Sequence, residues 1–550
     1  MTGLLVLTLP YRQLTGLLPQ VMRGACEQVN KVLYVHLDPA IAAATSSTIP
    51  ATSSTTSTPQ YNAHLSLHQA SNLIKSIYSK SSSLASSLDV RVVLSGFKGG
   101  SEIPVATNYA IEKVMIDCYA KENIPMLRSR YKNYLNGSDP IVLLKENECQ
   151  DTRDDSETTD SDVGSDKIAN TKIYKNIVAG GTFDHIHIGH KILITEGLLR
   201  CTNKFTIGVA DGPLLAKKTL TELIEPVGVR IKKLRSLLVD IDPSVEYCLE
   251  PIYEPLGPSG SDPDMEMIIV SQESLKGGNY VNSARVERKL NALDVVVIEL
   301  VEDIHRSDTE EEKVSSSSTR RRVLGTRIRE PDLTNKPEFP PYIIGLTGGS
   351  ASGKSSIAKR LSEKGVTVID CDKLGHRAYR KGTNCYHKLV STYGVGILKE
   401  DEEINRKALG AQVFGDAEKL SQLNKLVWPE IAKQVHEEVE AAKKAGAEVV
   451  VLDAAVLLEA DWDHMCHEVW VCMLPKTEAV ERICGRDGCS REQAETRLSK
   501  QMSDRDRLLR CHVPLCSLWD YDTTARQCYT ALDTVISDIK TIQASLKNTL

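Results

Sequence analysis

A glycine-rich segment followed by lysine and serine has the residue types and spacing of a triphosphate-binding loop. It fits the pattern GxxxxGK[ST] and comprises Gly348, Gly349, Ser350, Ala351, Ser352, Gly353, Lys354 and Ser355. Residues 342–347 are typical of a buried strand, and residues 356–361 are typical of an amphipathic helix. Backbone N–H groups at this helix N-terminus would face the phosphates, with Lys354 beside them and Ser355 as a ligand for Mg²⁺. We therefore predict ATP or GTP binding here; the alternative is a glycine-rich turn without a ligand.

Three acidic residues follow other predicted strands of the same region. Asp370 and Asp372 end the strand 366–369, and strand alternation predicts that their side chains point the same way. One of them could deprotonate an acceptor hydroxyl while the other orients the substrate. Asp453 follows the strand 449–452, at a position suited to holding Mg²⁺.

An arginine-rich stretch lies further along, between residues 481 and 503. It contains Arg482, Arg486, Arg491, Arg497 and Gln501. We predict a lid that closes over ATP and excludes water, with Arg486 and Arg497 as ATP contacts. The alternative is a surface helix with ordinary charges.

A second glycine-rich turn, in the middle of the chain, carries two histidines. The turn follows the predicted strand 173–178 and contains Gly181, Thr182, Phe183 and Asp184, which we predict to bind ATP. His187 and His190 are three residues apart at the start of a helix, so their imidazoles share one face. This placement suits a phosphate that gains charge during an in-line displacement, and we predict that both histidines are catalytic.

A run of serines and arginines at residues 315–322 could complete this phosphate site. Hydroxyl groups and helix N–H groups would hold phosphates there, and arginine would add bidentate contacts. The candidates for binding ATP are Ser317, Ser318, Arg320 and Arg322. The alternative is a solvated loop. Lys217 and Lys218, after the second strand of this region, are further candidate phosphate ligands, and Lys217 is a candidate for binding the substrate.

Composition limits the class of protein. A chain of 550 residues is too long for one core and suggests about three domains. The formal net charge of −6 argues against bulk binding to nucleic acid. The 14 cysteines contain no CxxC pair, which favours reduced thiols and a cytoplasmic location. No run of 18 apolar residues is present, so we expect no transmembrane segment.

Three connectors divide the sequence. Residues 146–167 are acidic with almost nothing apolar, which predicts disorder, and residues 331–341 form a proline-rich linker. A third segment, Ala42 to Gln60, predicts a loop within the first domain. The resulting domains are 1–145, 168–330 and 342–550. In the last two, β-branched runs alternate with helical patterns, so we predict an α/β fold with two doubly wound parallel sheets.

The first domain offers no catalytic constellation. We predict an α/β fold with strands at Leu4–Leu9, Leu33–Leu37 and Val90–Leu94 and a helix near Ala110–Tyr119. The first 26 residues contain no acid, which is similar to a mitochondrial transit peptide; the alternative, which we favour, is a strand followed by a helix. A regulatory role, or docking to a partner or to a membrane surface, is the hypothesis for residues 1–145. Association with mitochondria is part of that hypothesis.

The motifs of the two regions resemble those of two different families. The GGTFD…HxGH turn and the later SSTxxR-like run resemble the nucleotidylyltransferase superfamily, which joins a nucleoside triphosphate to a phosphate and releases pyrophosphate. The segments TGGSASGKS, VIDCDKLGHRAY, INRKALGAQVF and LDAAVLLEA resemble dephospho-coenzyme A kinase. That resemblance implies that Asp372 is the base for a ribose 3′-hydroxyl. The chain departs from it at Trp428-Pro429, where bacterial members often have His-Pro.

The order of the two regions resembles the bifunctional coenzyme A synthases of animals. This resemblance implies ATP and 4′-phosphopantetheine as substrates of the first site, dephospho-coenzyme A as substrate of the second, ATP as co-substrate of both and Mg²⁺ as cofactor. Bacterial adenylyltransferases for this acceptor often carry TxGH instead of HxGH, so the acceptor is inferred from the pairing of the two regions. The alternatives are a fused nicotinamide mononucleotide adenylyltransferase and ribosyl kinase, and a scaffold that only binds nucleotides.

Overall fold

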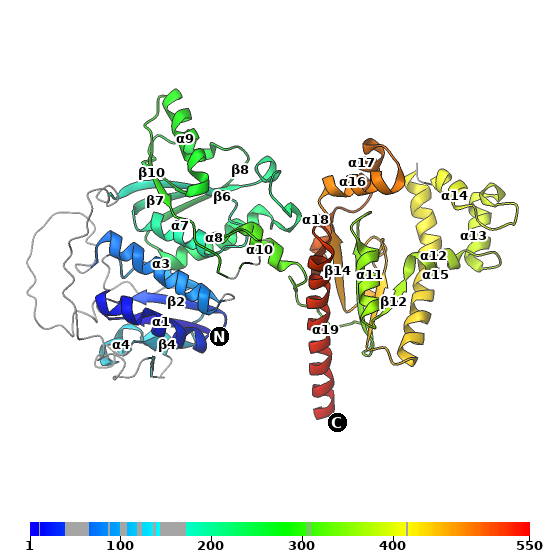
Figure 1. Ribbon diagram of the computed structural model, residues 1–550, viewed down its shortest axis with the longest axis horizontal. Coiled ribbons are helices and arrows are strands. Elements are labelled where there is room, and N and C mark those ends of the chain that lie inside the picture. Colours follow the sequence, from blue (N-terminus) through cyan, green and yellow to red (C-terminus); the bar gives the residue numbers. More distant parts are fainter. Residues whose placement is uncertain are drawn as a thin grey trace, which may run out of the picture. The chain divides into compact units, whose positions relative to one another are not determined.

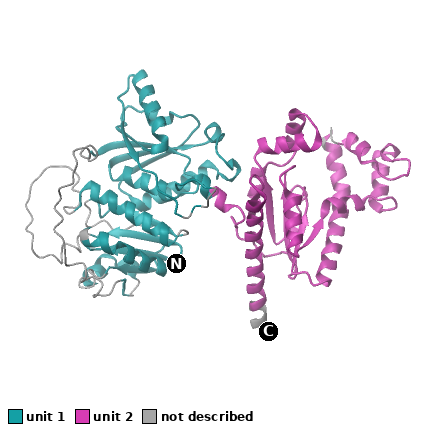
Figure 2. Cartoon of the chain, in the orientation of Figure 1, with its two compact units in different colours: residues 1–319 teal, residues 320–550 magenta. Residues whose placement is uncertain are grey.

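The computed structural model describes residues 1–9, 11–38, 65–85, 88–98, 107–117, 124–135, 139–143, 172–304, 306, 310–413 and 416–549. The chain forms two compact units, Met1–Thr319 and Arg320–Leu550 (Figure 2). The predicted linker at 146–167 and the predicted loop at 42–60 lie outside the described residues.

The first unit begins with a parallel sheet in the order β3-β2-β1-β4-β5. Its strands are β1 (Thr2–Leu7), β2 (Val32–Leu37), β3 (Asp89–Val93), β4 (Lys113–Ile116) and β5 (Ile141–Val142). Its helices are α1 (Tyr11–Gln28), α3 (Leu67–Leu84), α4 (Ile124–Arg130) and α5 (Lys132–Leu135). Alternate strand residues pack against α1 and α3 on one face and against α4 and α5 on the other. Both faces are covered, so the strands are apolar throughout.

A second parallel sheet of the same unit, coloured cyan to green in Figure 1, has the order β10-β9-β6-β7-β8. Its strands are β6 (Tyr174–Gly181), β7 (Cys201–Ala210), β8 (Glu246–Ile252), β9 (Met267–Ser271) and β10 (Asp294–Ile298). Its principal helices are α7 (Ile188–Leu198), α8 (Val227–Ile241) and α9 (Leu275–Glu287), followed by α10 (Ser316–Val323). Helices α7 and α8 pack on one face and α9 on the other. Counted along the chain, both sheets have the strand order 3-2-1-4-5, which places a crevice beyond the carboxyl end of the first strand.

The two sheets of the first unit share one hydrophobic core. Apolar residues of β1, β2, β3, α1 and α3 form a continuous cluster with those of α7, α8, β6 and β7. Helix α3 packs against α7, and strand β3 packs against α8. Residues 1–117 are thus joined to the second sheet by buried apolar contacts.

The second unit has a parallel sheet in the order β12-β13-β11-β14-β15. Its strands are β11 (Tyr342–Gly348), β12 (Thr367–Asp370), β13 (Val449–Asp453), β14 (Glu468–Met473) and β15 (Val513–Cys516). Helices α11 (Lys354–Glu363) and α19 (Tyr521–Thr549) cover one face. Helices α12 (Cys371–Ala378) and α15 (Ala417–Lys444) pack together and contact β12 and β13. The remaining α-helices are α13 (Asn384–Tyr393), α14 (Arg406–Val413), α16 (Lys476–Asp487), α17 (Arg491–Ser499) and α18 (Asp504–Leu509).

The predicted fold class is confirmed by these three parallel sheets flanked by helices. The helix predicted near 110–119 is wrong, because Lys113–Ile116 is strand β4 paired with β1. The run Val114-Met115-Ile116 is buried in the sheet, and a short apolar run of this kind does not distinguish strand from helix by periodicity. Strand β15 was not predicted. Among the described residues, no helix combines the length and the apolar character that a membrane span requires.

Candidate functional sites

The two histidines of the middle region lie together beyond the carboxyl end of β6. His187 is the N-cap residue of α7, and its ring lies 3.9 Å from that of His190 between centroids. Phe183 packs on the other side of His190, at a centroid distance of 5.2 Å. A Cβ on Gly189 would lie 3.1 Å from Cε1 of His187, so this glycine leaves space for the imidazole. The HxGH motif is therefore one packed structure in which the glycine and both rings depend on each other.

Both imidazoles are held in the neutral form. Burial lowers the pKa of His187 well below its ordinary value, and the neighbouring His190 and Lys191 add to this effect. Burial also lowers the pKa of His190 to about 4, with Asp184 opposing the change. Nδ1 of His187 is buried and has no hydrogen-bond partner within the described part of the chain. Neutral imidazoles at a helix N-terminus can hydrogen-bond phosphate oxygens without repelling each other.

The serine run reaches this site through Ser316. Its Oγ lies 3.5 Å from Nε2 of His187, at the start of α10. The predicted contacts Ser317 and Ser318 come later in the helix, and Ser318 is buried with its N–H donating to Oγ of Ser315. Ser316, which was not among the candidates, is thus the serine that contacts His187, and phosphate binding by Ser317 and Ser318 stays a prediction.

The four predicted basic ligands lie in two places, the loop after β7 and the second half of α10. Lys217 and Lys218 are exposed in the loop after β7, and the charge of Lys218 reaches His190. Arg320 is buried and Arg322 is exposed, both in the second half of α10. Of the four, Lys218 is the residue whose electrostatic contact with a histidine is shown. The other three stay predictions.

Arg230 on α8 organises the site, and sequence reasoning missed it. Its guanidinium is buried and donates to the carbonyl of Thr182 (2.7 Å) and to the carbonyl of Ala210 (2.9 Å). It also donates to Asp211 Oδ1 at 2.9 Å and to the carbonyl of Glu225 at 2.7 Å. One side chain therefore holds the loops after β6 and β7 together. No local motif marks it, because its partners come from three separate segments.

A cavity of about 170 Å³ lies on the α9 face of the same sheet. Gly180, Gly208 and Ile252 line it at the strand ends, and Ser274 and Val281 line it from the side of α9. Its walls are mainly apolar, and Gly180 leaves its backbone open to a ligand, whereas the side chain of Ile252 packs against Gly208.

The second unit assembles its candidate residues at the carboxyl ends of β11, β12 and β13. Lys354, the first residue of α11, hydrogen-bonds Asp453 and lies 3.6 Å from Oδ2 of Asp372. Burial opposes the charge on Lys354, but Asp453 and Asp372 outweigh this and raise the lysine pKa, so it stays protonated. Gly353 has φ of 91°, which a side chain would strain. The buried Oγ of Ser352 has no partner among the described residues and is available to a phosphate.

The expected geometry of the two neighbouring acids is wrong in one respect. Asp370 ends β12 and caps α12 by accepting the N–H of Lys373 at 2.9 Å, whereas Asp372 lies in the first turn of α12. Helical geometry, not strand alternation, therefore sets the direction of Asp372. Asp372 contacts Lys354, while Asp370 forms an ion pair with Lys373 at 2.9 Å.

The arginine-rich stretch forms α16 and α17, with Gln501 and α18 after it. Arg486 and Arg497 both contact Asp487, with Arg497 at 2.7 Å. Gln501 bridges the glycine-rich loop by accepting the N–H of Ser350 and donating to its hydroxyl. Gln501 therefore attaches this stretch to the phosphate loop. Arg486 and Arg497, the two predicted ATP contacts, both pair with the carboxylate of Asp487.

Arg507 was not among the predicted residues. It is buried beside Gly349 and donates to Asp504 at 3.0 Å and to Glu459 at 3.2 Å. The sequence DRDR after Gln501 was the available signal, because charged residues that alternate so closely at the start of a helix include some that face inward.

Comparison with known proteins assigns a family to each region. The family described as dephospho-CoA kinase matches residues 342–517, the cytidylyltransferase-like family matches 178–322, and the family described as COASY N-terminal domain matches 1–115. The dephospho-CoA kinase of Carboxydothermus hydrogenoformans is 36% identical over 190 residues, which cover 34% of this chain and 92% of that protein. The dephospho-CoA kinase of Shouchella clausii is 34% identical, covering 34% of this chain and 96% of that protein. The corresponding kinase of Oryza sativa subsp. japonica is 38% identical, covering 29% and 70%.

The folds and sites thus define an enzyme with a nucleotidyltransferase region and a kinase region that both use ATP. Through its second unit the chain belongs to the dephospho-CoA kinase family. The three matches on one chain of 550 residues make it a bifunctional coenzyme A synthase, and the fused nicotinamide mononucleotide enzyme is not favoured.

Proposed function

We propose that the chain carries out two consecutive ATP-dependent transfers. At the first site, the phosphate of 4′-phosphopantetheine attacks the α-phosphorus of ATP, giving 3′-dephospho-coenzyme A and pyrophosphate. At the second site, the ribose 3′-hydroxyl of that product attacks the γ-phosphorus of a second ATP, giving coenzyme A and ADP. The observation that carries this proposal is the pairing on one chain, because the product of an adenylyltransferase for 4′-phosphopantetheine is the substrate of a dephospho-CoA kinase.

In the first transfer, the chain would act by positioning and by charge stabilisation. His187 and His190, both neutral, donate hydrogen bonds to phosphate oxygens at the start of α7, and Ser316 approaches from the start of α10. Lys218 contributes a positive charge in the adjoining loop. The apolar cavity beside Gly180 and Gly208 suits the uncharged pantetheine arm of the acceptor.

In the second transfer, the loop at 348–355 would bind the phosphates of ATP, and Asp372 would accept the proton of the attacking hydroxyl. Lys354 is shared with two acids and would move its contacts to the β- and γ-phosphates when ATP binds. Arg486 and Arg497 would leave Asp487 and close on the nucleotide, which excludes water from the site.

The oxygen donors present in the kinase site suit Mg²⁺. The carboxylate of Asp453 lies at the end of β13, and Ser355 follows Lys354 at the start of α11. Both are hard oxygen ligands of the kind that Mg²⁺ prefers, and we propose that they hold it. When bound, the ion would neutralise charge on the β- and γ-phosphates.

The leading segment has an internal explanation for its apolar composition. Leu4, Leu5, Val6 and Leu7 of β1 are fully buried, and β1 lies at the centre of its sheet, between β2 and β4. The apolar composition of residues 4–7 is therefore what a central strand requires for folding. Docking of residues 1–145 to a partner or membrane, and association with mitochondria, stay predictions; a deletion of residues 1–30 would remove the central strand and would not test them.

Mass-resolved product analysis tests the proposed function. The purified chain is incubated with Mg·ATP and 4′-phosphopantetheine, and we expect dephospho-coenzyme A to appear first and coenzyme A afterwards. Nicotinamide mononucleotide serves as the rival acceptor in a parallel reaction. If the chain phosphorylates added dephospho-coenzyme A but forms none from 4′-phosphopantetheine, the acceptor assigned to the first site is wrong.

A further inference from the structure

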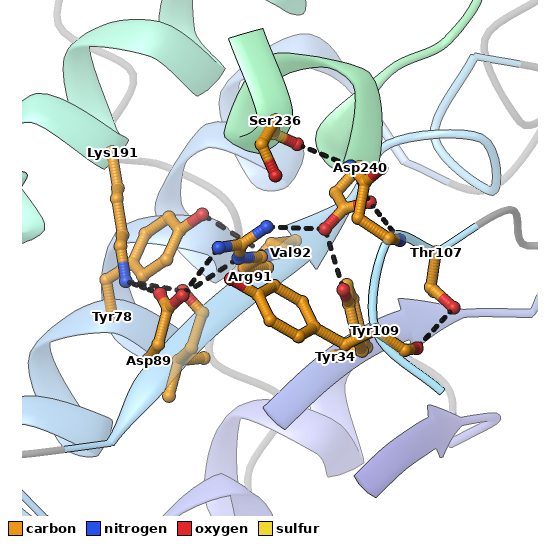
Figure 3. Close-up of polar contacts among 12 residues, drawn as sticks. Tyr34, Tyr78, Asp89, Arg91, Val92, Thr107, Tyr109, Lys191, Ser236 and Asp240 are labelled. Atoms are coloured by element: carbon orange, nitrogen blue, oxygen red, sulfur yellow. Dashed lines mark hydrogen bonds and ion pairs between the residues drawn. The ribbon is translucent and has the colours of Figure 1, made fainter. Parts of the chain in front are cut away.

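The interface between the two sheets of the first unit contains a network of charges in which Arg91, Lys191 and Asp240 are buried and Asp89 is partly exposed (Figure 3). Asp89, the first residue of β3, accepts a hydrogen bond from Nζ of Lys191 at 2.6 Å through Oδ1. Nζ of Lys191 also donates to the carbonyl of Val90 at 2.8 Å. The other carboxylate oxygen of Asp89 accepts two hydrogen bonds from Arg91, at 2.9 and 2.8 Å. Strand β3 of the first sheet therefore holds a side chain of α7, which belongs to the second.

Lys191 is attached to the histidine motif. It directly follows His190 in the first turn of α7, and it is only 7% exposed. A buried ammonium group must be paired, so the place of its partner constrains the turn from which it extends. Burial lowers the pKa of Lys191, and Asp89 opposes that change. The ion pair thus retains the charge of Lys191 at a fixed point beside the two histidines.

The same strand also holds α8. Arg91 contacts Asp240, and the hydroxyl of Tyr34 donates to the same carboxylate at 2.6 Å (Figure 3). Helix α8 carries Arg230, which holds the loops after β6 and β7. Both helices that shape the adenylyltransferase site are therefore anchored on β3.

In the first sheet, a side chain of the protein occupies the position at which this sheet topology would place a ligand. Its strand order equals that of the second sheet, so a phosphate would be expected beyond the carboxyl end of β1. There the N–H groups of Thr8 and Leu9 donate to the carboxylate of Asp117, at 2.6 and 3.1 Å. The carboxylate of Asp117 thus satisfies the N–H groups that would otherwise bind a phosphate. We therefore look for the contribution of the first sheet to adenylyl transfer in its contacts with α7 and α8.

We propose that Asp89 is a positioning residue of the adenylyltransferase, which acts through Lys191 to set the first turn of α7 and with it His187 and His190. This inference rests on the proposed function. It makes residues 1–117 a component of that active site, although none of them touches the reacting atoms. A displacement of the histidines by about 1 Å is enough to reduce the rate by roughly 100-fold, because in-line transfer requires close alignment.

The test uses the full-length chain and compares Asp89→Asn, Lys191→Met and the double variant. We expect Asp89→Asn to lower kcat for adenylyl transfer by roughly 10- to 100-fold, with a smaller change in KM for ATP. Kinase activity of the same molecules should be unchanged, which shows that the second unit is folded and that the variants are correctly quantified. If Asp89 acts through Lys191, the double variant loses no more activity than Lys191→Met alone. Asp89→Glu, which keeps the charge, should recover part of the rate.

Lys98→Met is the matched control. Lys98 lies in the turn that follows β3, pairs with Asp242 at 2.6 Å and donates to the carbonyl of Cys201 at 2.7 Å. This variant therefore removes an ion pair of equal length from the same interface but not from α7. Unfolding of each variant is measured alongside activity. Equal losses of kcat in Lys98→Met and Asp89→Asn would overturn the proposal, since the interface would then act only through stability.

Three further results are decisive. Normal kcat in Asp89→Asn, or additive losses in the double variant, overturns the positioning role while leaving the proposed function intact. If Asp89→Asn does not fold, Lys191→Met decides, because it leaves Asp89 paired with Arg91 and should still show the loss of kcat. If the unsubstituted chain forms no adenylyl product, the proposed function fails and the positioning role with it.

Discussion

Nζ of Lys354 hydrogen-bonds the carboxylate of Asp453 and lies 3.6 Å from Oδ2 of Asp372, so one lysine contacts both acids of the kinase site. The contact joins the start of α11 to the end of β13 and to the first turn of α12. A triphosphate would compete with the two carboxylates for this lysine. Binding of ATP would therefore release Asp372 toward the acceptor hydroxyl and Asp453 toward a metal ion, which couples nucleotide binding to assembly of the site.

Single substitutions should separate the two activities. We expect Lys354→Met to lower the kinase rate by about 100-fold or more, because it removes the charge beside the phosphates, and to make dephospho-coenzyme A accumulate. His190→Ala should have an effect of similar size on adenylyl transfer alone. Each half-reaction is assayed separately with its own substrate. Loss of both activities in either variant would contradict the assignment of separate sites.

Substitution of the neighbouring acids Asp370 and Asp372 should affect the kinase rate differently. Asp372→Asn removes the proposed base and should lower kcat by roughly 100- to 10,000-fold with little change in KM for ATP. Asp370→Asn is the matched control, because asparagine caps a helix as well as aspartate does and only the exposed pair with Lys373 is lost. We expect this control to retain most of its activity. A larger loss in Asp370→Asn would show that the base is Asp370.

The sequence was sufficient to predict features that depend on neighbouring residues. The strand and helix around the loop at 348–355 are present, as is the helix that begins after His187. The contact of Ser316 with His187 was not predicted, because it joins two helix starts that are 129 residues apart in sequence. The direction of Asp372 was misjudged because β12 ends at Asp370 and the helix begins at once.

Contacts between distant segments could not be predicted. Arg230 binds the carbonyl of Thr182 across 48 residues of sequence, and Lys191 binds Asp89 across 102. Neither pair belongs to a motif, and both depend on how the two sheets pack. From the sequence alone, a charged residue is predicted to lie at the surface, and its burial can be recognised only when its partner is known.

Arg230 should contribute strongly to the stability of the first unit. Arg230→Met leaves the carbonyls of Thr182 and Ala210 and the carboxylate of Asp211 without their donor, which should cost about 3–5 kcal/mol. Arg230→Lys should recover little of this, because lysine cannot supply the planar set of donors. The measurement is urea unfolding of the first unit. Arg235→Met, at an exposed position of the same helix, is the control and should change stability by less than about 0.5 kcal/mol.

Stability should fall as the pH falls from about 6.5 to 4, because His36, His187 and His190 of the first unit are neutral in the folded chain. Burial lowers the pKa of His36 to about 4, with Asp38 opposing and Arg130 adding to the change, and burial lowers that of His190 to about 4 as well. Histidine has a pKa of about 6.5 in the unfolded chain. Between pH 6.5 and 4 the unfolded chain therefore binds more protons than the folded chain, so acid favours unfolding.

A pKa near 4 in place of 6.5 corresponds to at most about 3 kcal/mol per histidine, all of it lost once the pH is below the folded value. We expect the free energy of unfolding at pH 7 to exceed that at pH 5, with a shallower dependence in His36→Asn, which cannot take up the proton. The dependence is measured by urea unfolding at several pH values. His68→Asn is the control, because this histidine lies at the start of α3 and its exposed side chain contacts Asn72 in the next turn of the same helix. A pH dependence that is identical in His36→Asn and in the unsubstituted chain would show that His36 does not contribute to acid sensitivity.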